Sequence, residues 1–408
     1  MKILLINKYF YLKGGAEKHF FALRQLLRDH DFTVVDFAMK DKKNISSPDE
    51  KYFISYINTE KIFSWSIFKT LGRIFWSLEA RKKIKKIIIK EKPNLAHLHN
   101  IYHQISPSIL PIFKKYKIPV IMTVHDFALI SPSINMFANG KIYAKIIGRH
   151  YYRCLFDRCV KKSFWLSLAS ALEMYFHHKI LKVYQKNIDL FICPSQFLAK
   201  MLIKAGFKED KIIVLPNFIT SANSSSIDKK ENEKYLLYFG RLSAEKGINV
   251  LLETMKNLPN INLKIAGTGP EEVNCLNTIK KYDLKNVALL GYQTADHLLS
   301  LISNAYAVVV PSICYENCPL SILESLALGK PIIASDIGGI PELITNNGNG
   351  LLVKANNPEA LATAIKKLWL DDHLCLSLSK QALNTSASYS PNTYFDQLNK
   401  LYQKVSCH

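Results

Sequence analysis

Short apolar runs alternate with longer amphipathic segments through the first half of the chain. Five apolar runs bounded by polar or turn-forming residues predict buried strands, at 3–6, 32–37, 95–98, 120–124 and 190–193. Patterns with a period near 3.6 residues predict helices at 16–28, 67–90 and over much of 142–186. Strands that alternate with helices indicate a parallel sheet covered on both faces. The region 142–186 is longer than a strand-to-strand crossover needs, which indicates a helical insertion.

The same alternation restarts after a polar stretch. Strands are predicted at 235–239, 262–266, 287–290, 307–310 and 331–334, and helices at 249–257, 271–282, 295–303, 319–328 and 358–370. The sequence therefore predicts two doubly wound, Rossmann-like α/β domains at 1–217 and 235–388. The small and charged residues of 218–234 predict a linker, and 389–408 predicts a terminal helix.

Composition agrees with a globular chain of two domains. The 408 residues are enough for two cores, and 48% of them are hydrophobic. No run of 18 apolar residues predicts a membrane-spanning helix, and residues 1–7 fit a first strand better than a signal peptide. Eight scattered cysteines are expected to be reduced thiols in a cytoplasmic protein. Four residues separate Cys154 from Cys159, but no second Cys or His pair nearby has zinc-site spacing.

Positive charge is concentrated in the first half. Residues 1–217 carry 37 Lys and Arg against 16 Asp and Glu, whereas the rest carries 17 of each. The stretches 61–92 and 141–186 each hold ten basic and two acidic residues. Both also contain large aromatic residues: Phe63, Trp65, Phe68, Phe75, Trp76, Tyr151, Tyr152, Phe156, Phe164 and Trp165. This combination suits an anionic membrane surface or acceptor, or nucleic acid, or a solvated basic face over a helical core.

The most distinctive motif, Pro311–Gly329, follows a predicted strand. Glu316 lies in its loop, and Pro319 suits the first turn of the next helix. Free N–H groups near Leu320 and Ser321 would then attract a phosphate. Glu316 and Glu324, eight residues apart, are suited to accept hydrogen bonds from sugar hydroxyls. By themselves they could also be an ordinary loop acid and a surface helix acid.

Two further glycine-containing turns follow strands in the second half. Gly240–Gly247 contains Arg241 and Lys246, a pair that matches a diphosphate but could also form a charged turn. Gly267, in a Gly-Thr-Gly-Pro turn, offers exposed backbone where a base could dock.

In the first half, Gly14-Gly15 follows the first strand and allows close approach to an anion. The dinucleotide fingerprint Gly-x-Gly-x-x-Gly is not matched there. His125 ends another strand, where ligands bind, although single histidines are usually structural. His97, His99 and His103 lack neighbouring cysteines or carboxylates, so no metal site is predicted.

Taken together and in this order, the motifs resemble those of glycosyltransferase family 4, which has the GT-B fold. The resemblance rests on the Gly-Gly turn, His125-Asp126, the Gly-Arg-Leu-Ser-x-Glu-Lys-Gly turn and the Glu316–Glu324 spacing, and it spans nearly the whole chain.

The resemblance implies roles for these residues. Arg241 and Lys246 would neutralise the donor diphosphate without a metal ion, and Glu324 would hold the ribose. Glu316 and His125 would contact the donor sugar. Gly15 would lie near the diphosphate.

The implied activity is the transfer of a sugar, with retention, from a nucleotide-sugar to a glycan or lipid-linked acceptor. The first domain would bind the acceptor and the second the donor, in cell-surface polysaccharide synthesis at the inner membrane face. No cofactor and no nucleic-acid partner are expected. The alternatives are a sugar-nucleotide epimerase or another enzyme of this fold, and a non-catalytic basic protein that binds nucleic acid.

Overall fold

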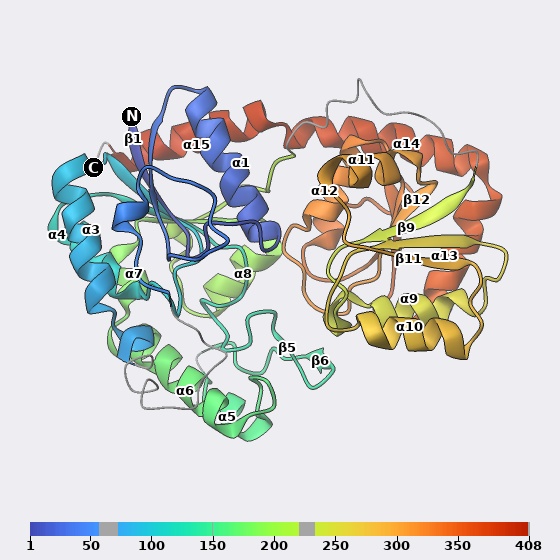
Figure 1. The fold of residues 1–408 in the computed structure, drawn as a ribbon, viewed down its shortest axis with the longest axis horizontal. Helices are drawn as coiled ribbons and strands as arrows, with labels where there is room; N and C mark the ends of the chain where they lie inside the picture. Colours follow the sequence, from blue (N-terminus) through green and yellow to red (C-terminus); the bar gives the residue numbers. More distant parts are fainter. Residues whose placement is uncertain (57–71, 149, 220–232, 407–408) are drawn as a thin grey trace. The chain divides into compact units, whose positions relative to one another are not determined.

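The computed structural model describes residues 1–56, 72–148, 150–219 and 233–406 (Figure 1). The chain divides into two compact units. The N-terminal unit comprises residues 1–138, 143–216 and 394–408, and the C-terminal unit comprises 139–142 and 217–393.

A sheet of six parallel strands forms the centre of the N-terminal unit, in the order β2-β1-β3-β4-β7-β8. The strands are β1 (Lys2–Ile6), β2 (Thr33–Phe37), β3 (Leu95–Leu98), β4 (Val120–Thr123), β7 (Leu190–Cys193) and β8 (Ile212–Val214). The α-helices are α1 (Gly15–Asp29), α3 (Leu78–Glu91), α4 (Leu110–Lys115), α5 (Arg153–Asp157), α6 (Phe164–Met174), α7 (Val183–Asn187) and α8 (Gln196–Lys204). A small hairpin joins β5 (Phe137–Ala138) to β6 (Lys141–Ile142), and η3 (Tyr175–Ile180) is π-helical.

The C-terminal unit repeats this plan, with strand order β11-β10-β9-β12-β13-β14. Its strands are β9 (Tyr235–Phe239), β10 (Asn262–Ala266), β11 (Val287–Gly291), β12 (Ala307–Val310), β13 (Ile332–Ser335) and β14 (Gly350–Val353). Its helices are α9 (Ile248–Met255), α10 (Glu272–Lys281), α11 (Ala295–Asn304), α12 (Leu320–Ala327), α13 (Pro358–Leu370) and α14 (Asp372–Ser386).

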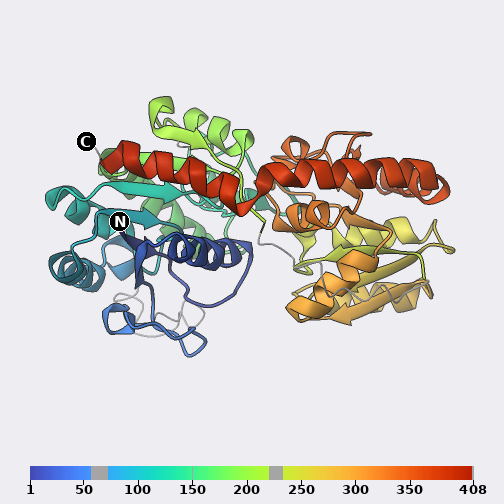
Figure 2. The same ribbon diagram turned by 90° about the horizontal axis from the view of Figure 1, so that it is seen from above.

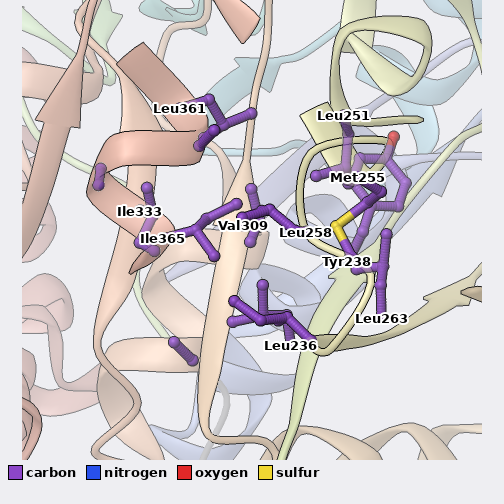
Figure 3. Packing of buried hydrophobic residues seen from close by; sticks show 14 of the residues in the cluster. Leu236, Tyr238, Leu251, Met255, Leu258, Leu263, Val309, Ile333, Leu361 and Ile365 are labelled. Atoms are coloured by element: carbon purple, nitrogen blue, oxygen red, sulfur yellow. The ribbon is translucent and has the colours of Figure 1, made fainter. Parts of the chain in front are cut away.

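Each face of the C-terminal sheet has its own core. Along β9, Leu236 and Tyr238 pack into a cluster with residues of α9 and α13 (Figure 3). Leu237 and Phe239 pack on the opposite face. Successive side chains of a strand point to opposite faces, so both sets must be apolar when helices cover both sides. This requirement explains the continuous apolar run 235–239.

The two parallel sheets confirm the predicted fold class, and most predicted strands lie within one residue of those observed. The strands β5, β6, β8 and β14 and the helices α4, α8 and α14 were missed. Parts of five predictions lie outside the described residues: the helix 67–90, the basic stretch 61–92 with Phe63, Trp65 and Phe68, the region 141–186 at residue 149, the linker 218–234, and the terminal helix 389–408 at residues 407–408.

The last helix, α15 (Pro391–Ser406), packs against the N-terminal unit (Figure 2). The Tyr402 hydroxyl lies 2.6 Å from Nδ1 of His97, which is on β3, and the two residues are fully buried. Phe395 stacks on His30 with ring centroids 3.6 Å apart. The C-terminal segment therefore completes the core of the N-terminal unit.

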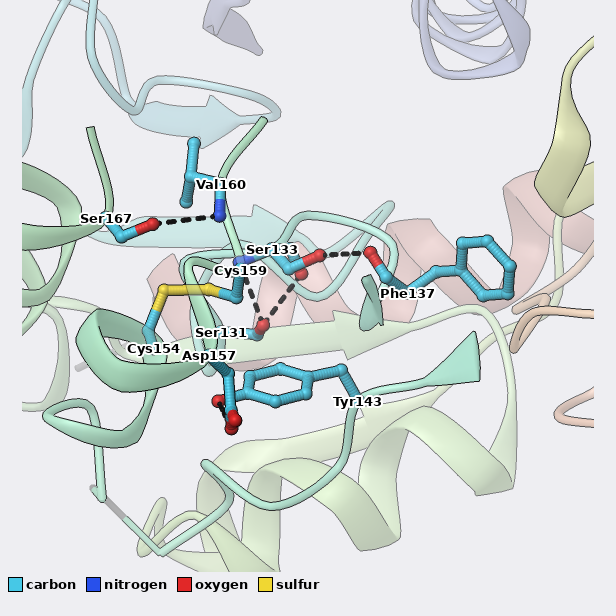
Figure 4. The surroundings of a disulfide bond; sticks show 9 residues. All are labelled: Ser131, Ser133, Phe137, Tyr143, Cys154, Asp157, Cys159, Val160 and Ser167. Carbon is cyan, nitrogen blue, oxygen red and sulfur yellow. Dashed lines mark hydrogen bonds between the residues drawn. A yellow bond between two sulfur atoms is a disulfide. The ribbon is translucent and has the colours of Figure 1, made fainter. Parts of the chain in front are cut away.

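One expectation about the cysteines is wrong. Cys154 and Cys159 form a disulfide that closes the turn after α5 (Figure 4). Free thiols are observed at five buried positions: Cys193, Cys275, Cys314, Cys318 and Cys375. The spacing of the two cysteines was compared only with zinc-ligand spacing, which does not test for a disulfide across a short turn. Because disulfides persist in oxidising environments, the predicted cytoplasmic location loses the support that it drew from reduced cysteines.

None of the described helices has the length and apolar character needed to span a bilayer.

Candidate functional site

In the C-terminal sheet, β9 and β12 are neighbours, and the strand order reverses between them. β10 and β11 extend the sheet on the side of β9, whereas β13 and β14 extend it on the side of β12. At such a reversal the connections leave toward opposite faces, which leaves room for a ligand beyond the carboxyl ends of the strands. The two segments that follow these strands are Gly240–Gly247 and Pro311–Glu316. These are the two motifs to which the sequence assigned the donor.

The two segments approach each other closely. Gly247 has a φ of +73°, and a Cβ built there would lie 1.8 Å from the carbonyl oxygen of Pro311. The backbone N–H of Ile313 donates to the carbonyl of Glu245 over 3.0 Å. A residue without a side chain is therefore required at 247 for both conformation and space.

This approach brings Lys246 to Glu316. Lys246 Nζ lies 2.6 Å from Oε1 of Glu316, and the Ser312 hydroxyl donates to the same oxygen over 2.7 Å. Glu316 is buried and Lys246 is half-buried. Burial is the largest single influence on Lys246 and opposes its charge, but the interactions with Glu316, Cys314 and Glu245 together raise the lysine pKa. Lys246 therefore stays charged at neutral pH.

Helix α12 begins one residue later than predicted. Pro319 is extended, at φ −65° and ψ 122°, and precedes the helix as its N-cap. Leu320 and Ser321 are in the first turn, where backbone N–H groups have no partner within the helix. Glu324 lies in the second turn and is half-buried. The helix therefore presents an anion-attracting end directly after the Glu316 loop.

Gly267 lies beside the Gly240–Arg241 turn. Its φ is +143°, and a Cβ there would lie 1.9 Å from the Gly240 carbonyl oxygen. The adjacent Thr268 carbonyl accepts from the Leu242 N–H over 2.9 Å. Arg241 itself is exposed. The structure thus brings together the predicted residues Gly267 and Arg241 at the carboxyl edge of β9 and β10.

Two features that hold Glu316 in place were missed. Ser312 binds its carboxylate, and Gly338 (φ +63°) lies so close that a Cβ would be 2.4 Å from the Glu316 carbonyl oxygen. The Gly339 N–H donates to that oxygen over 2.7 Å. The Gly-Gly pair after a predicted strand was a signal available in the sequence.

The N-terminal sheet has its own reversal, between β1 and β3. The predicted residue Gly15 begins α1, after the extended Gly14, and is exposed. The predicted residue His125 follows β4, and its Nε2 lies 2.7 Å from Nδ1 of His99.

A polar cluster at this reversal was also missed. Asn7 and Lys8 follow β1, and Asn100 follows β3. The Asn7 side-chain oxygen accepts from the Asn100 N–H over 3.1 Å. The Tyr102 hydroxyl lies at hydrogen-bond distance from both Asn100 Oδ1 (2.6 Å) and a carboxylate oxygen of Asp126. The signal was present, because polar residues directly follow two predicted strands.

Lys8 is the least ordinary member of this cluster. It is buried, and its ammonium lies 4.3 Å from the centre of the Tyr102 ring. Within the described residues, it has no acceptor at hydrogen-bond distance. Burial lowers the pKa of Lys8, against the attraction of Asp126 and Glu17, and burial raises the pKa of both acids. Burying an ammonium whose N–H groups have no acceptor costs free energy, unless a ligand supplies the acceptors.

Four histidines extend this cluster toward the core. His99 stacks between His97 and His125, with ring centroids 4.8 and 5.0 Å away, and His19 lies 5.3 Å from His125. Burial lowers the pKa of His97 to about 3 and of His125 to about 4, and it lowers the pKa values of His19 and His99 well below normal. Across the described parts of the chain, no grouping of His, Cys, Asp and Glu is suited to hold a metal ion.

Comparisons with known families and relatives agree with this geometry. The family described as "Glycosyl transferases group 1" matches residues 220–385, and that described as "Glycosyltransferase Family 4" matches residues 13–222. An uncharacterized glycosyltransferase of Methanocaldococcus jannaschii is 24% identical over 408 residues, covering 100% of this chain and 99% of its own. An N,N'-diacetylbacillosaminyl-diphospho-undecaprenol alpha-1,3-N-acetylgalactosaminyltransferase of Campylobacter jejuni is 28% identical over 247 residues, or 56% of this chain and 64% of its own.

Among solved structures, Anabaena HepE in complex with UDP-glucose superposes with a TM-score of 0.67 at 19% identity. The match covers 99% of this chain and 100% of that one. At this identity the likeness concerns the fold.

The close approach at Gly247 predicts a difference between two glycines of similar conformation. Gly291 has a φ of +67° but open space around its Cβ position. Gly291→Ala should therefore lose only about 1 kcal/mol of unfolding free energy, the cost of a left-handed alanine. Gly247→Ala should lose at least about 1 kcal/mol more, because the Pro311 backbone must shift. Urea unfolding of both variants measures the two free-energy losses. Equal losses for Gly247→Ala and Gly291→Ala would contradict the close approach at Gly247.

The histidine stack predicts acid sensitivity. The folded-state pKa values lie below the unfolded value of about 6.5, so below that pH the unfolded chain binds more protons. The unfolding free energy should fall between about pH 6.5 and 4, by up to about 1.4 kcal/mol per pH unit per histidine. Urea unfolding followed across this range should show a shallower slope for His125→Gln. The exposed His150, changed to Gln, is the control and should leave the slope unchanged.

Proposed function

This chain belongs to glycosyltransferase family 4, and we propose that it moves a sugar from a nucleotide-sugar to a glycan or lipid-linked acceptor with retention of configuration. The observation that carries the donor assignment is the Lys246–Glu316 ion pair at the strand reversal, directly before the N-terminus of α12. A cation, an acid suited to accept from sugar hydroxyls and free N–H groups therefore lie along one edge of the sheet, which supports the donor assignment.

The donor diphosphate would be bound by positive groups of the protein. Arg241 is exposed in the turn after β9 and offers a rigid fork of N–H donors. Lys246 offers an ammonium on a flexible side chain. The N–H groups of Leu320 and Ser321 add the partial positive charge of a helix N-terminus. These groups would stabilise the charge on the leaving diphosphate, and we propose that no metal ion is needed.

Glu316 has a second task besides pairing with Lys246. Its Oε1 accepts from Lys246 and Ser312, and a carboxylate has further acceptor sites for the hydroxyls of a donor sugar. A buried negative charge there would also stabilise positive charge that develops on the sugar ring as the diphosphate leaves. Glu324, one turn into α12, would bind the ribose hydroxyls, and Gly267 would lie against the base.

We assign the N-terminal residues Gly15 and His125 to the diphosphate and the donor sugar, respectively, as the family resemblance implies. His125 is kept neutral by burial, so it can donate a hydrogen bond to a hydroxyl without adding charge. Retention follows when the acceptor attacks the face from which the diphosphate leaves, and the leaving phosphate oxygen takes the acceptor's proton.

The acceptor would bind at the reversal of the N-terminal sheet. There Lys8 supplies unused donors, and two acids, the buried Glu17 and the half-buried Asp126, have no ion-pair partner among the described residues. Mixed donors and acceptors beside the aromatic ring of Tyr102 suit a hydroxyl-bearing sugar. We therefore assign this cluster to the acceptor sugar.

The wider setting is proposed on charge and on one relative. The excess of cations in residues 1–217 favours work at an anionic membrane surface, here proposed as the cytoplasmic, inner face. The Campylobacter relative is named for an undecaprenol-linked acceptor. A lipid-linked acceptor and a place in cell-surface polysaccharide synthesis fit both observations.

The donor site predicts opposite effects for two changes. Nucleoside diphosphates at millimolar concentration should raise the melting temperature, and Arg241→Ala/Lys246→Ala should abolish that shift because the phosphate contacts are lost. Glu316→Gln should keep or increase the shift, since it leaves Lys246 without its anionic partner. It should nevertheless reduce sugar transfer about 100-fold or more.

Thermal-shift screening and mass-spectrometric detection of transfer to lipid extracts provide the two measurements. An equal loss of nucleotide binding and transfer in Glu316→Gln would contradict its assignment. Stabilisation by oligonucleotides alone would contradict the donor site altogether.

The acceptor site predicts a selective defect for Lys8→Met, which keeps the length of the side chain and removes its donors. Transfer to lipid extracts should fall at least about tenfold, while the thermal shift with nucleoside diphosphates stays unchanged. The matched control is Lys13→Met, since Lys13 is exposed and its ammonium lies 3.9 Å from the centre of the Tyr9 ring. A similar fall in both variants would show that Lys8 does not bind the acceptor.

A further inference from the structure

Helix α5, the turn after it and the start of α6 expose four large aromatic side chains. Within residues 152–165, here called the aromatic-basic turn, Phe156 is 79% exposed, Trp165 74%, Tyr152 56% and Phe164 41%. Figure 1 shows α5 and α6 at the periphery of the N-terminal unit. Grouped aromatic side chains of this size on a surface mark an interaction site.

Cations are interleaved with these aromatic residues. Four basic residues of the turn are exposed: Arg153, Arg158, Lys161 and Lys162. The single acid of the segment, Asp157, accepts a hydrogen bond from the Tyr143 hydroxyl over 2.7 Å. The exposed surface of the turn is therefore apolar and positive, with its one negative group engaged by the protein.

The turn is built to hold this arrangement. The Cys154–Cys159 disulfide closes it, and the Val160 N–H donates to the Ser167 hydroxyl over 3.1 Å (Figure 4). Ser163 caps α6.

Its backbone also adopts a conformation that side chains disfavour. Arg158, Lys161 and Lys162 have φ angles of 44°, 48° and 56°, in the left-handed region. Strain of this kind is found where the surrounding structure fixes a functional segment.

We propose that the aromatic-basic turn is a membrane-docking surface for an anionic bilayer. Phe156 and Trp165 enter the boundary between head groups and acyl chains, while Arg158, Lys161 and Lys162 lie among lipid phosphates. This inference deepens the proposed function, on which it rests, because it identifies the residues that would hold the enzyme beside a lipid-linked acceptor.

A bilayer fits these observations better than a nucleic acid. Tyr152, Phe156 and Trp165 are more than half exposed, so they can enter an apolar phase. A bilayer supplies that apolar phase directly beneath a layer of phosphates, which matches apolar tips among cations. Nucleic acid offers bases for aromatic side chains to stack on only where the bases are unpaired. Binding to single-stranded nucleic acid is therefore the alternative that the experiment tests.

The test uses sedimentation of the full-length protein with vesicles of phosphatidylglycerol and phosphatidylcholine, or of phosphatidylcholine alone. Wild type should bind the anionic vesicles at low salt and be released at high salt. Phe156→Ser/Trp165→Ser should weaken binding at least about tenfold, since each side chain loses an apolar burial site. Arg158→Gln/Lys161→Gln/Lys162→Gln should weaken it by a similar factor.

The matched control is Leu370→Ser/Leu376→Ser, which removes two exposed apolar side chains (83% and 69% exposed) from the C-terminal unit. It should bind vesicles like wild type. Brominated acyl chains should quench tryptophan fluorescence in wild type but not in Trp165→Phe, which places Trp165 in the bilayer. Cys154→Ser/Cys159→Ser should bind more weakly, because the turn is no longer closed.

Several results would overturn the docking surface: no binding to anionic vesicles, an equal loss in the leucine control, or quenching that persists in Trp165→Phe. Tighter binding to single-stranded oligonucleotides that the same substitutions remove would assign the turn to nucleic acid instead. The nucleoside diphosphate thermal shift is measured on every variant. Vesicle binding without that shift would contradict the proposed donor site and leave the docking surface standing.

Discussion

A parallel sheet that is covered on both faces must reverse its order of strand addition once, and each sheet of this protein does so near its middle. The reversal separates two neighbouring connections at the carboxyl edge of the sheet. In the C-terminal unit it falls between β9 and β12, and in the N-terminal unit between β1 and β3. The candidate donor and acceptor residues follow these four strands and their neighbours, so the topology fixes where chemistry can occur.

Close backbone packing then determines the geometry of the donor residues. Because Gly247 and Gly338 have no side chains, the segment after β12 can approach those after β9 and β13 closely enough for backbone hydrogen bonds. Lys246 and Glu316 meet as a result, 70 positions apart in sequence. In the ion pair, Lys246 offsets the negative charge of Glu316 beside the proposed phosphate site, which an unpaired carboxylate would repel.

Much of this was accessible from the sequence. Continuous apolar runs identified most strands, because residues buried on both faces must be apolar. The motifs after the strands predicted Arg241, Lys246, Glu316 and Glu324 as candidate donor residues. The missed strand β14 contains a glycine and only four residues, too little for a clear pattern. Lys8 was missed because a single lysine near a strand is indistinguishable from a surface lysine until its burial is known.

The sequence by itself determined the fold class, the family resemblance and the uneven distribution of charge, since each depends on residue type and local order. Only the tertiary structure decided that Lys246 pairs with Glu316, that Tyr402 packs on His97, and that Cys154 bonds to Cys159. It also decided which aromatic residues of 141–186 are exposed. The first two facts arise from packing of segments far apart in the chain, whereas the disulfide and the exposures depend on local distances and burial. None of them leaves a periodic pattern in the sequence.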